Sequence, residues 1–300
     1  MNLSNKTKAV LYILASAFGF AMMNLFVRLA GDLPSMEKSF FRNLVAMLVA
    51  AFLLLREDDH PTFRTLLWGK GNLPDLLLRS AAGTVGILCN FYAVDHLLLA
   101  NASMLNKMSP FFALLFSFLL LREKLTPVQI GVVAVAFGGS MLIVKPTLSN
   151  LDLVPSLLGL LGGVCAGFAY TMVRKLGLKG ERGSYIVFFF STFSCLVLLP
   201  WLVLNYVPMT GYQLAMLLLA GVSATIGQFG ITAAYTHAPA REVSVFDYSQ
   251  VVFSAVLGYF VFRDVPDGWS FLGYLLIIGA AVVIFLYNNG YLQRRKENQG

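Results

Sequence analysis

The stretch that decides the fold class of this sequence is Leu275-Leu276-Ile277-Ile278-Gly279-Ala280-Ala281-Val282-Val283-Ile284. Its apolar side chains follow one another without interruption, whereas a strand of a membrane β-barrel alternates apolar and polar residues. The apolar character continues outward on both sides, over residues 269–290. A helix that crosses a hydrocarbon core of about 30 Å needs roughly 20 apolar residues. This segment therefore predicts a transmembrane helix.

Further segments of the same length and character occur throughout the chain. The sequence therefore predicts an all-α integral membrane protein with ten transmembrane helices. The predicted helices are residues 8–30, 34–55, 73–96, 99–121, 127–145, 154–176, 184–206, 210–236, 241–262 and 269–290.

The overall composition agrees with a membrane protein. Of the 300 residues, 58% are hydrophobic and 12% are charged, whereas soluble domains carry about 25% charged residues. This balance excludes a disordered chain, a secreted disulfide scaffold and a nucleic-acid-binding module. The three cysteines all lie in apolar segments, with no metal-ligand spacing. We expect no metal and no cofactor.

Enzyme signatures are missing from the sequence. It contains no HExxH, GxSxG or GxxxxGK[ST] motif. The longest predicted loop, from Arg56 to Asn72, is too short to hold a catalytic domain. We therefore expect no enzyme activity, no catalytic residues and no ATP hydrolysis within this chain.

The basic residues indicate the orientation in the membrane. With the N-terminus in the cytoplasm, sixteen of the 22 Lys and Arg, Arg79 among them, fall at the inner side. Four fall at the outer side, and Arg42 and Lys107 remain inside helices. This bias follows the positive-inside rule. It predicts a multi-pass protein of the cell membrane whose N- and C-termini are both cytoplasmic, with residues 292–300 as a cytoplasmic tail.

The two halves of the chain resemble each other. Residues 86–130 align without a gap on residues 227–271, with identities such as His96 with His237 and Arg122 with Arg263. We therefore predict two repeats of five helices, residues 1–146 and 154–291. Because five is an odd number of crossings, the second repeat enters the membrane from the opposite side. Inverted repeats are typical of secondary transporters, whose substrate site lies between the halves.

One region carries a family resemblance. Residues 102–115, read as ASMLNKMSPFFALL, are followed by LREKLTP at 121–127, and residues 243–257 and 262–264 repeat the pattern more weakly. These stretches resemble the EamA-type module of the drug/metabolite transporter superfamily. The resemblance implies ten helices in two inverted repeats and secondary transport of a small metabolite. Lys107 stands where the family usually has a neutral residue, and Val251 stands where the second module usually has a proline.

Three charges at bilayer depth are the main candidates for a substrate site. Lys107 lies about 12 Å from the outer end of its predicted helix at 1.5 Å per residue, and Arg42 lies at a similar depth. Asp247 lies in the inner half of the ninth helix, so these depths disfavour direct contact with Lys107. Charges in a membrane interior are costly and mark functional sites by default. We expect Lys107 and Arg42 to face a negative substrate group, and Asp247 to bind an amine or carry a proton.

Polar residues on neighbouring helices extend this predicted site. Stripes on the fourth, eighth and ninth helices indicate a wet cavity, although Ser and Thr stripes also bond helices together. Pro110 leaves the Asn106 carbonyl without its helical donor. Arg42 has the alternative of pairing with Glu37 or with a backbone carbonyl. The remaining predicted substrate-binding residues are Asn24, Asn90, Asn106, Tyr170, Gln228, Ser244 and Tyr248.

These features predict a secondary transporter that moves a small polar organic metabolite by alternating access. The substrate is anionic or zwitterionic, with an amino-acid-like charge pattern. The alternatives are efflux of aromatic or cationic compounds, for which a 13% aromatic content is suitable, and a membrane scaffold that moves nothing. The expected partners are the small-molecule substrate and the lipid bilayer, with no nucleic acid. Coupling to a proton or another ion, and the choice between monomer and homodimer, stay open.

Overall fold

The computed structural model describes residues 5–57, 71–121, 126–144, 152–237 and 244–288. Every regular element in this part of the chain is helical. The elements are α1 (Asn5–Leu29), α2 (Ser35–Glu57), α4 (Leu73–His96), α5 (Leu99–Asn106), α6 (Ser109–Leu121), α7 (Pro127–Val144), α8 (Leu153–Leu178), α9 (Gly183–Asn205), α10 (Gly211–His237), the 3₁₀ helix η1 (Ser244–Tyr248), α12 (Ser249–Phe262) and α13 (Gly268–Asn288).

Length and composition make eight stretches of the described chain candidate membrane spans. Two shorter apolar helices, Pro127–Ile143 and Phe246–Phe262, accompany them. The ends of the helices follow local chemistry. Gly31 and Gly180, with φ of 69° and 77°, follow α1 and α8, where a left-handed residue that ends a helix is tolerated best as glycine. The described part of the chain thus has the helices of a membrane protein, as the sequence predicted.

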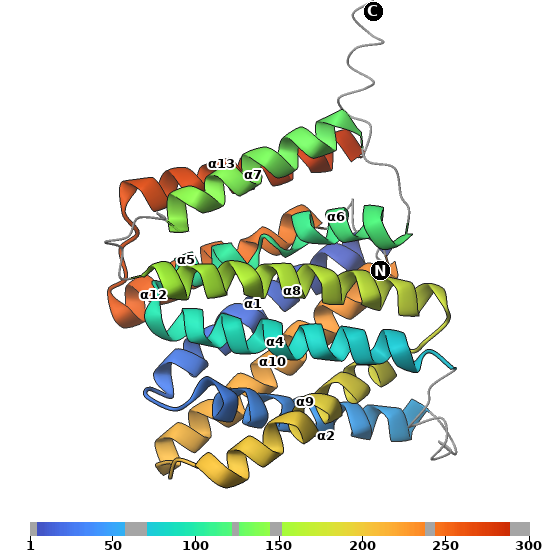
Figure 1. The fold of residues 1–300 in the computed structure, drawn as a ribbon, viewed down its shortest axis with the longest axis vertical. Coiled ribbons are helices and arrows are strands. Elements are labelled where there is room, and N and C mark those ends of the chain that lie inside the picture. The colour runs from blue at the N-terminus through green and yellow to red at the C-terminus, as the bar shows by residue number, and fades with distance from the viewer. Residues whose placement is uncertain (1–4, 58–70, 122–125, 145–151, 238–243, 289–300) are drawn as a thin grey trace, which may run out of the picture.

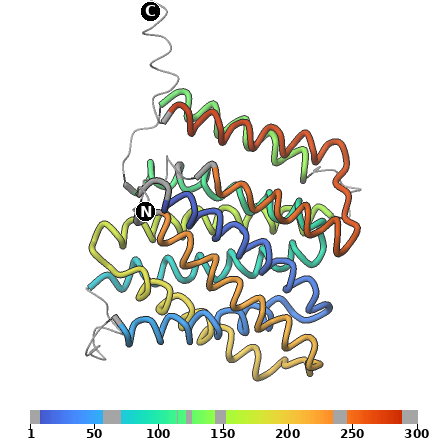
Figure 2. Tube along the Cα trace, turned by 180° about the vertical axis from the view of Figure 1, so that it is seen from behind, coloured from blue at the N-terminus to red at the C-terminus, as the bar shows by residue number. Residues whose placement is uncertain are grey.

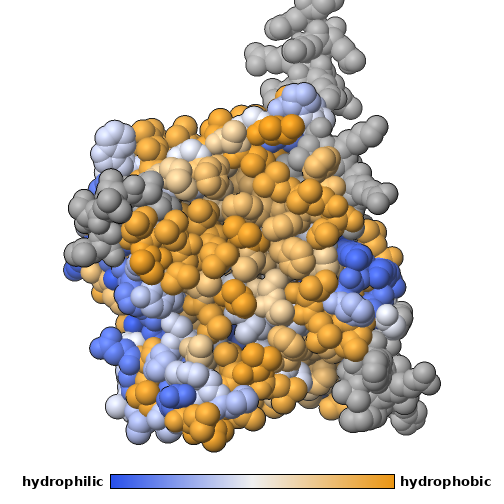
Figure 3. Space-filling view, viewed as in Figure 1, coloured by the Kyte–Doolittle hydropathy of each residue, from blue (hydrophilic) through white to orange (hydrophobic). Residues whose placement is uncertain are grey.

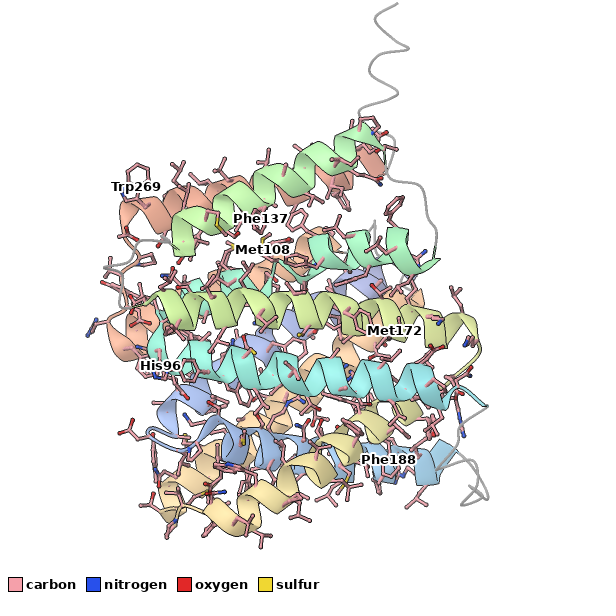
Figure 4. The ribbon with its side chains drawn as sticks, viewed as in Figure 1. His96, Met108, Phe137, Met172, Phe188 and Trp269 are labelled. Carbon is pink, nitrogen blue, oxygen red and sulfur yellow. The ribbon has the colours of Figure 1, made fainter. Side chains whose placement is uncertain are left out.

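Two of the predicted helices are interrupted, which corrects the sequence analysis. The segment 99–121 is divided into α5 and α6 at Lys107 and Met108, and Figure 4 labels Met108 at this point. Pro110 has no N–H to donate to the Asn106 carbonyl, so an unbroken helix is disfavoured here. In the segment 241–262, residues 244–248 form a 3₁₀ helix before α12 begins, and residues 241–243 lie outside the described part.

Helices from the two halves of the chain pack against one another in pairs. Helix α1 packs on α10, α4 on α8, α2 on α9 and α7 on α13. In Figures 1 and 2, α7 and α13 form a layer of their own beside the other helices. Both views also place the start of α1 and the end of α13 at the same end of the bundle. Within the described residues, each hydrophobic core cluster contains side chains from both halves.

Glycines allow helices of the two halves to approach each other closely. A Cβ on Gly163 of α8 would lie 2.6 Å from the Leu105 carbonyl oxygen, and one on Gly167 would lie 2.6 Å from that of Ser109. A Cβ on Gly230 of α10 would lie 2.9 Å from the carbonyl oxygen of Tyr12. Glycine-mediated contact of helix backbones is common in membrane proteins. The contacts of Gly163 and Gly167 pack α8 directly against the interruption between α5 and α6.

The surface separates apolar and polar side chains as a bilayer requires. Figure 3 shows a face covered mainly by hydrophobic residues, with hydrophilic ones gathered toward its left and right edges. Large apolar side chains such as Leu204, Phe260 and Leu55 are exposed along the helices. Helix α4 runs between these edges, and we call its two limits the Asp75 end and the His96 end. Figure 4 shows His96 and Trp269 on the same side of the molecule, at the His96 end.

Candidate functional site

Two buried charges from different halves of the chain form one ion pair. The Lys107 Nζ donates to Asp247 Oδ2 at 2.6 Å, and both residues are 1% exposed. Lys107 is the C-cap of α5, and Asp247 lies in η1, so each stands where a helix is interrupted. The other carboxylate oxygen, Asp247 Oδ1, has no hydrogen-bond partner. The pair joins the two halves of the chain and leaves one buried acceptor unused.

This contact overturns the prediction that Lys107 and Asp247 lie at depths too different to meet. That prediction counted 1.5 Å per residue along regular helices from opposite membrane surfaces. A 3₁₀ helix rises about 2.0 Å per residue, so η1 carries Asp247 deeper than the count allowed. The long, flexible side chain of Lys107 covers the remaining distance.

A chain of amide and hydroxyl groups runs beside the ion pair. Asn90 Nδ2 donates to Asn24 Oδ1 at 3.2 Å, and Asn24 Nδ2 donates to Ser103 Oγ at 3.4 Å. Ser103 Oγ in turn donates to Ser254 Oγ at 2.7 Å. All four residues are buried. They come from α4, α1, α5 and α12, so the predicted wall residues Asn24 and Asn90 meet in one network.

Arg42 is buried in the middle of α2 without a carboxylate partner. It is 2% exposed, its Nη1 donates to Asn43 Oδ1 at 2.6 Å, and its Nε has no hydrogen-bond partner. The alternative pairing with Glu37 is not formed. One oxygen of Glu37 accepts the Val207 N–H at 3.3 Å, and the other is unpartnered. The positive charge of Arg42 is therefore not neutralised by an acid in the described part of the chain.

A second arginine, Arg79 of α4, lies beside Arg42. The sequence predicts Arg79 at the inner side of the membrane, and in the structure its side chain is buried, at 2% exposure. Its guanidinium carbon lies 3.7 Å from the centroid of the Phe190 ring, and that of Arg42 lies 5.8 Å from the same ring. The Nε and Nη1 of Arg79 have no hydrogen-bond partner. The only hint in the sequence was its position within, rather than beside, an apolar segment.

Tyr170 of α8 interacts with both sets of charged groups. It interacts electrostatically with Asp247 on one side and with Arg42 and Arg79 on the other. Tyr170 is thus within electrostatic reach of an acidic residue and of two arginines.

The other predicted site residues have less definite positions. Tyr248 ends η1 and is buried, with its ring 6.2 Å from that of Phe111. Gln228 of α10 is 7% exposed, and Asn106 is half-buried at the end of α5. Ser244 begins η1, but its side chain lies outside the described part of the structure.

Ion pairs tie the halves of the chain together at both ends of the bundle. At the His96 end, Arg28 of α1 donates to Asp264 at 2.5 Å, and Asp264 also accepts the Leu99 N–H at 3.0 Å. At the Asp75 end, Asp75 of α4 accepts from Lys175 at 2.8 Å and from Lys179 at 2.7 Å. Within the described residues, no group of His, Cys, Asp and Glu has a metal-binding arrangement.

An open cleft lies at the His96 end, outside the site itself. It has a volume of about 300 Å³. None of the predicted substrate-binding residues lines it, so it is separate from the buried network. Its lining residues are Arg28, Gly31, Asp32, Leu33, Pro34, Ser35, Tyr92, Asp95 and His96.

Comparison with known proteins identifies the family. The model of the EamA-like transporter family matches residues 7–145 and again residues 154–286. The chain is 34% identical to the pseudopaline exporter CntI of Pseudomonas aeruginosa, over 93% of this chain and 96% of that protein. It is 26% identical to a riboflavin transporter of Brucella anthropi, over 93% and 98% of the two chains.

A solved crystal structure has the same fold. It superposes with a TM-score of 0.65 at 18% sequence identity, and covers 91% of this chain and 98% of that one. The family match confirms the resemblance seen in the sequence, and with it the expectation that the protein is not an enzyme. The chain belongs to the EamA-like transporter family and is a multi-pass membrane transporter.

Proposed function

We propose that this protein is a secondary transporter that moves a small polar organic metabolite across the cell membrane by alternating access. The substrate is anionic or zwitterionic, with an amino-acid-like charge pattern. The observation that carries this proposal is the Lys107–Asp247 pair, buried between the two halves with one carboxylate oxygen unused. A charge pair in a membrane interior is costly and is retained for function by default.

The proposed architecture is ten helices in two inverted repeats, residues 1–146 and 154–291. The pattern of helix contacts supports it. If α1 corresponds to α8 and α4 to α10, then the α1–α10 contact corresponds to the α8–α4 contact. In the same way, the packing of α6 on α8 corresponds to that of α12 on α1. Exchanging the halves therefore reproduces the contacts, as expected of a duplicated unit.

Each charged residue has a role in this proposal. Arg42 and Lys107 attract a negative group of the substrate into the interior. Asp247 binds a substrate amine through Oδ1 or exchanges a proton. A substrate amine bound there competes with the Lys107 ammonium for the negative charge of Asp247. The buried Asn24 and Asn90 supply hydrogen bonds to the uncharged part of the substrate. Asn106, Tyr170, Gln228, Ser244 and Tyr248 complete the proposed lining.

Alternating access requires that each end of the bundle open in turn. The ion pairs at the two ends join the halves, and they supply contacts that break as the protein opens. The positive-inside bias places the Asp75 end and both termini in the cytoplasm. The cleft at the His96 end then serves as the vestibule on the outer side.

A screen followed by flux measurement tests the function. The purified protein is heated with members of a metabolite library, because a ligand that binds the folded state raises the melting temperature. Compounds that stabilise it are then loaded into proteoliposomes, with protein-free liposomes as the control. We expect anionic or zwitterionic compounds to stabilise the protein and to cross only the membranes that contain it.

The competing functions give different outcomes. If only aromatic or cationic compounds stabilise the protein and cross the membrane, efflux of such compounds replaces the proposed substrate class. If no compound crosses, and cysteines introduced at 103, 107 and 247 resist labelling from both sides, a scaffold role replaces transport.

A further inference from the structure

Two arginines from different helices share one aromatic ring in the membrane interior. Arg42 of α2 and Arg79 of α4 both lie over Phe190 of α9, and each is 2% exposed. The two guanidinium groups are close enough to repel each other. Two like charges that are both withheld from water and held together raise the energy of the empty protein. Such an arrangement needs an explanation beyond packing.

The Arg79 side chain points into the membrane interior, in a space that the local sequence provides for it. An arginine near the end of a membrane helix ordinarily extends toward the water–lipid interface. Arg79 is close to the start of α4, yet its guanidinium lies over Gly83, one turn further into the membrane. A Cβ on Gly83 would lie 2.7 Å from Arg79 Nη1 and 2.7 Å from Phe190 Cε2. Glycine at position 83 thus provides the space for an inward-facing guanidinium.

Arg79 also lacks the acidic partner that its own helix offers. Asp75 lies four residues earlier, the spacing at which an ion pair forms on a helix. Asp75 instead accepts from Lys175 and Lys179 of α8. Arg79 Nε and Nη1 and Arg42 Nε remain without hydrogen-bond partners. A buried donor left unsatisfied carries a desolvation penalty, which is larger when the group is charged.

We infer that Arg42 and Arg79 form a binding subsite for a carboxylate group of the transported compound. Guanidinium groups form charge-assisted N–H bonds to carboxylates, and Nε and Nη1 of Arg79 and Nε of Arg42 are available for such bonds. The Phe190 ring covers one face of each guanidinium group with an apolar surface. Tyr170 lies within electrostatic reach of both arginines and of Asp247. In this inference, a zwitterion binds the arginines through its carboxylate and Asp247 through its ammonium group.

This inference deepens the proposed function and rests on it, but it is tested by binding alone. The probe is malonate, a small dicarboxylate, compared with potassium chloride at matched ionic strength. The melting temperature of the purified protein is measured against malonate concentration in detergent. Arg79→Gln and Arg42→Gln are compared with Arg56→Gln. Arg56 is a suitable control because it is also an α2 arginine over a phenylalanine ring, 4.8 Å from Phe52, but is exposed.

We expect malonate to stabilise the wild-type protein and the Arg56→Gln variant equally. In Arg79→Gln and Arg42→Gln, half-saturation should need roughly tenfold more malonate or more, because charge-assisted hydrogen bonds are lost. Without malonate, Arg79→Gln should melt no lower than Arg56→Gln, since an unpaired buried charge has been removed. A merely structural arginine would instead lower the melting temperature of the empty protein.

Two further variants keep the inference testable if the glutamine variants do not fold. Gly83→Ala keeps the charge but displaces the guanidinium, so it should lose the malonate response. Arg79→Lys keeps the charge without the planar fork and should retain only part of it. An undiminished response in Arg79→Gln or Gly83→Ala would overturn the subsite, and stabilisation by inorganic phosphate but not by malonate would overturn the carboxylate assignment.

Failure of this inference is distinguishable from failure of the proposed function. If the wild-type protein binds malonate through the arginines but proteoliposomes move no screened compound, the subsite stands and the transport proposal fails. If the liposomes move an anionic or zwitterionic compound and Arg79→Gln leaves both its flux and the malonate response unchanged, the transport proposal stands and the subsite fails.

Discussion

The Lys107 ammonium donates to the Asp247 carboxylate at 2.6 Å, and each residue stands where a helix of a different half is interrupted. Replacing one partner leaves the other as an uncompensated buried charge, which costs about 3–5 kcal/mol. Replacing both partners removes that penalty. Comparing the single variants with the double variant therefore separates the effect of the ion pair on stability from its role in transport.

We predict that Lys107→Ala alone lowers the free energy of unfolding by about 3–5 kcal/mol, and that Lys107→Ala/Asp247→Ala recovers most of this loss. Substrate flux should be lost in both variants. Denaturation in detergent measures the first effect and proteoliposome flux the second. Lys175→Ala is the matched control, because Asp75 keeps Lys179 and Lys175 is partly exposed. Wild-type flux in the double variant would show that the pair is only structural.

A second prediction concerns the seating of α8 on the α5–α6 interruption. Gly163→Ala should destabilise the protein by about 1–3 kcal/mol, because the new Cβ would lie 2.6 Å from the Leu105 backbone oxygen. Gly177→Ala in the same helix meets no atom within 4 Å and should be neutral or slightly stabilising. Thermal unfolding of the two variants side by side measures the difference. Equal melting temperatures would mean that α8 does not pack on this interruption.

Much of the fold was predictable because helix positions depend on local hydrophobicity. The predicted segment 73–96 coincides with α4, and 127–145 differs from α7 by a single residue. The bilayer requires about 20 apolar residues per crossing whatever the neighbours are. The interruption at Lys107 was suggested by Pro110, but the 3₁₀ geometry of η1 has no comparable signal in the sequence. That geometry and the length of the Lys107 side chain together account for the contact between Lys107 and Asp247.

The candidate site was predictable only in part, because the directions of long side chains depend on distant residues. Arg42 and Lys107 were found because charge is rare within apolar segments. Arg79 was missed because it is near a helix end, where snorkelling is the default. Its inward direction depends on the space at Gly83 and on the ring of Phe190, and the latter belongs to the other half of the chain.

A third prediction concerns the orientation of the chain. The start of α1 and the end of α13 lie at the same end of the bundle, and the positive-inside rule places that end in the cytoplasm. In a background without the three native cysteines, single cysteines introduced at Asn2 and Gln299 should react with an impermeant maleimide only after the cells are permeabilised. A cysteine at Trp269, which lies at the His96 end, should react in intact cells. Reaction of only one terminus in intact cells would contradict an even number of crossings.

The last prediction assigns a function to the ion pairs at the two ends. Asp264 accepts from both Arg28 and the backbone N–H of Leu99, so it holds α1 to the start of α5 at the His96 end. Asp264→Asn weakens both contacts and should favour opening at that end. Asp75→Asn, which weakens the contacts to Lys175 and Lys179, should favour opening at the other.

Labelling of a cysteine at the buried Ser103 measures this opening. In the background without native cysteines, Ser103→Cys should react several-fold faster with an external impermeant maleimide when combined with Asp264→Asn, and more slowly when combined with Asp75→Asn. Opposite responses are expected because closing one end accompanies opening the other, so each substitution shifts the same equilibrium in a different direction. If both substitutions speed external labelling equally, they loosen the bundle as a whole, and the ion pairs do not alternate.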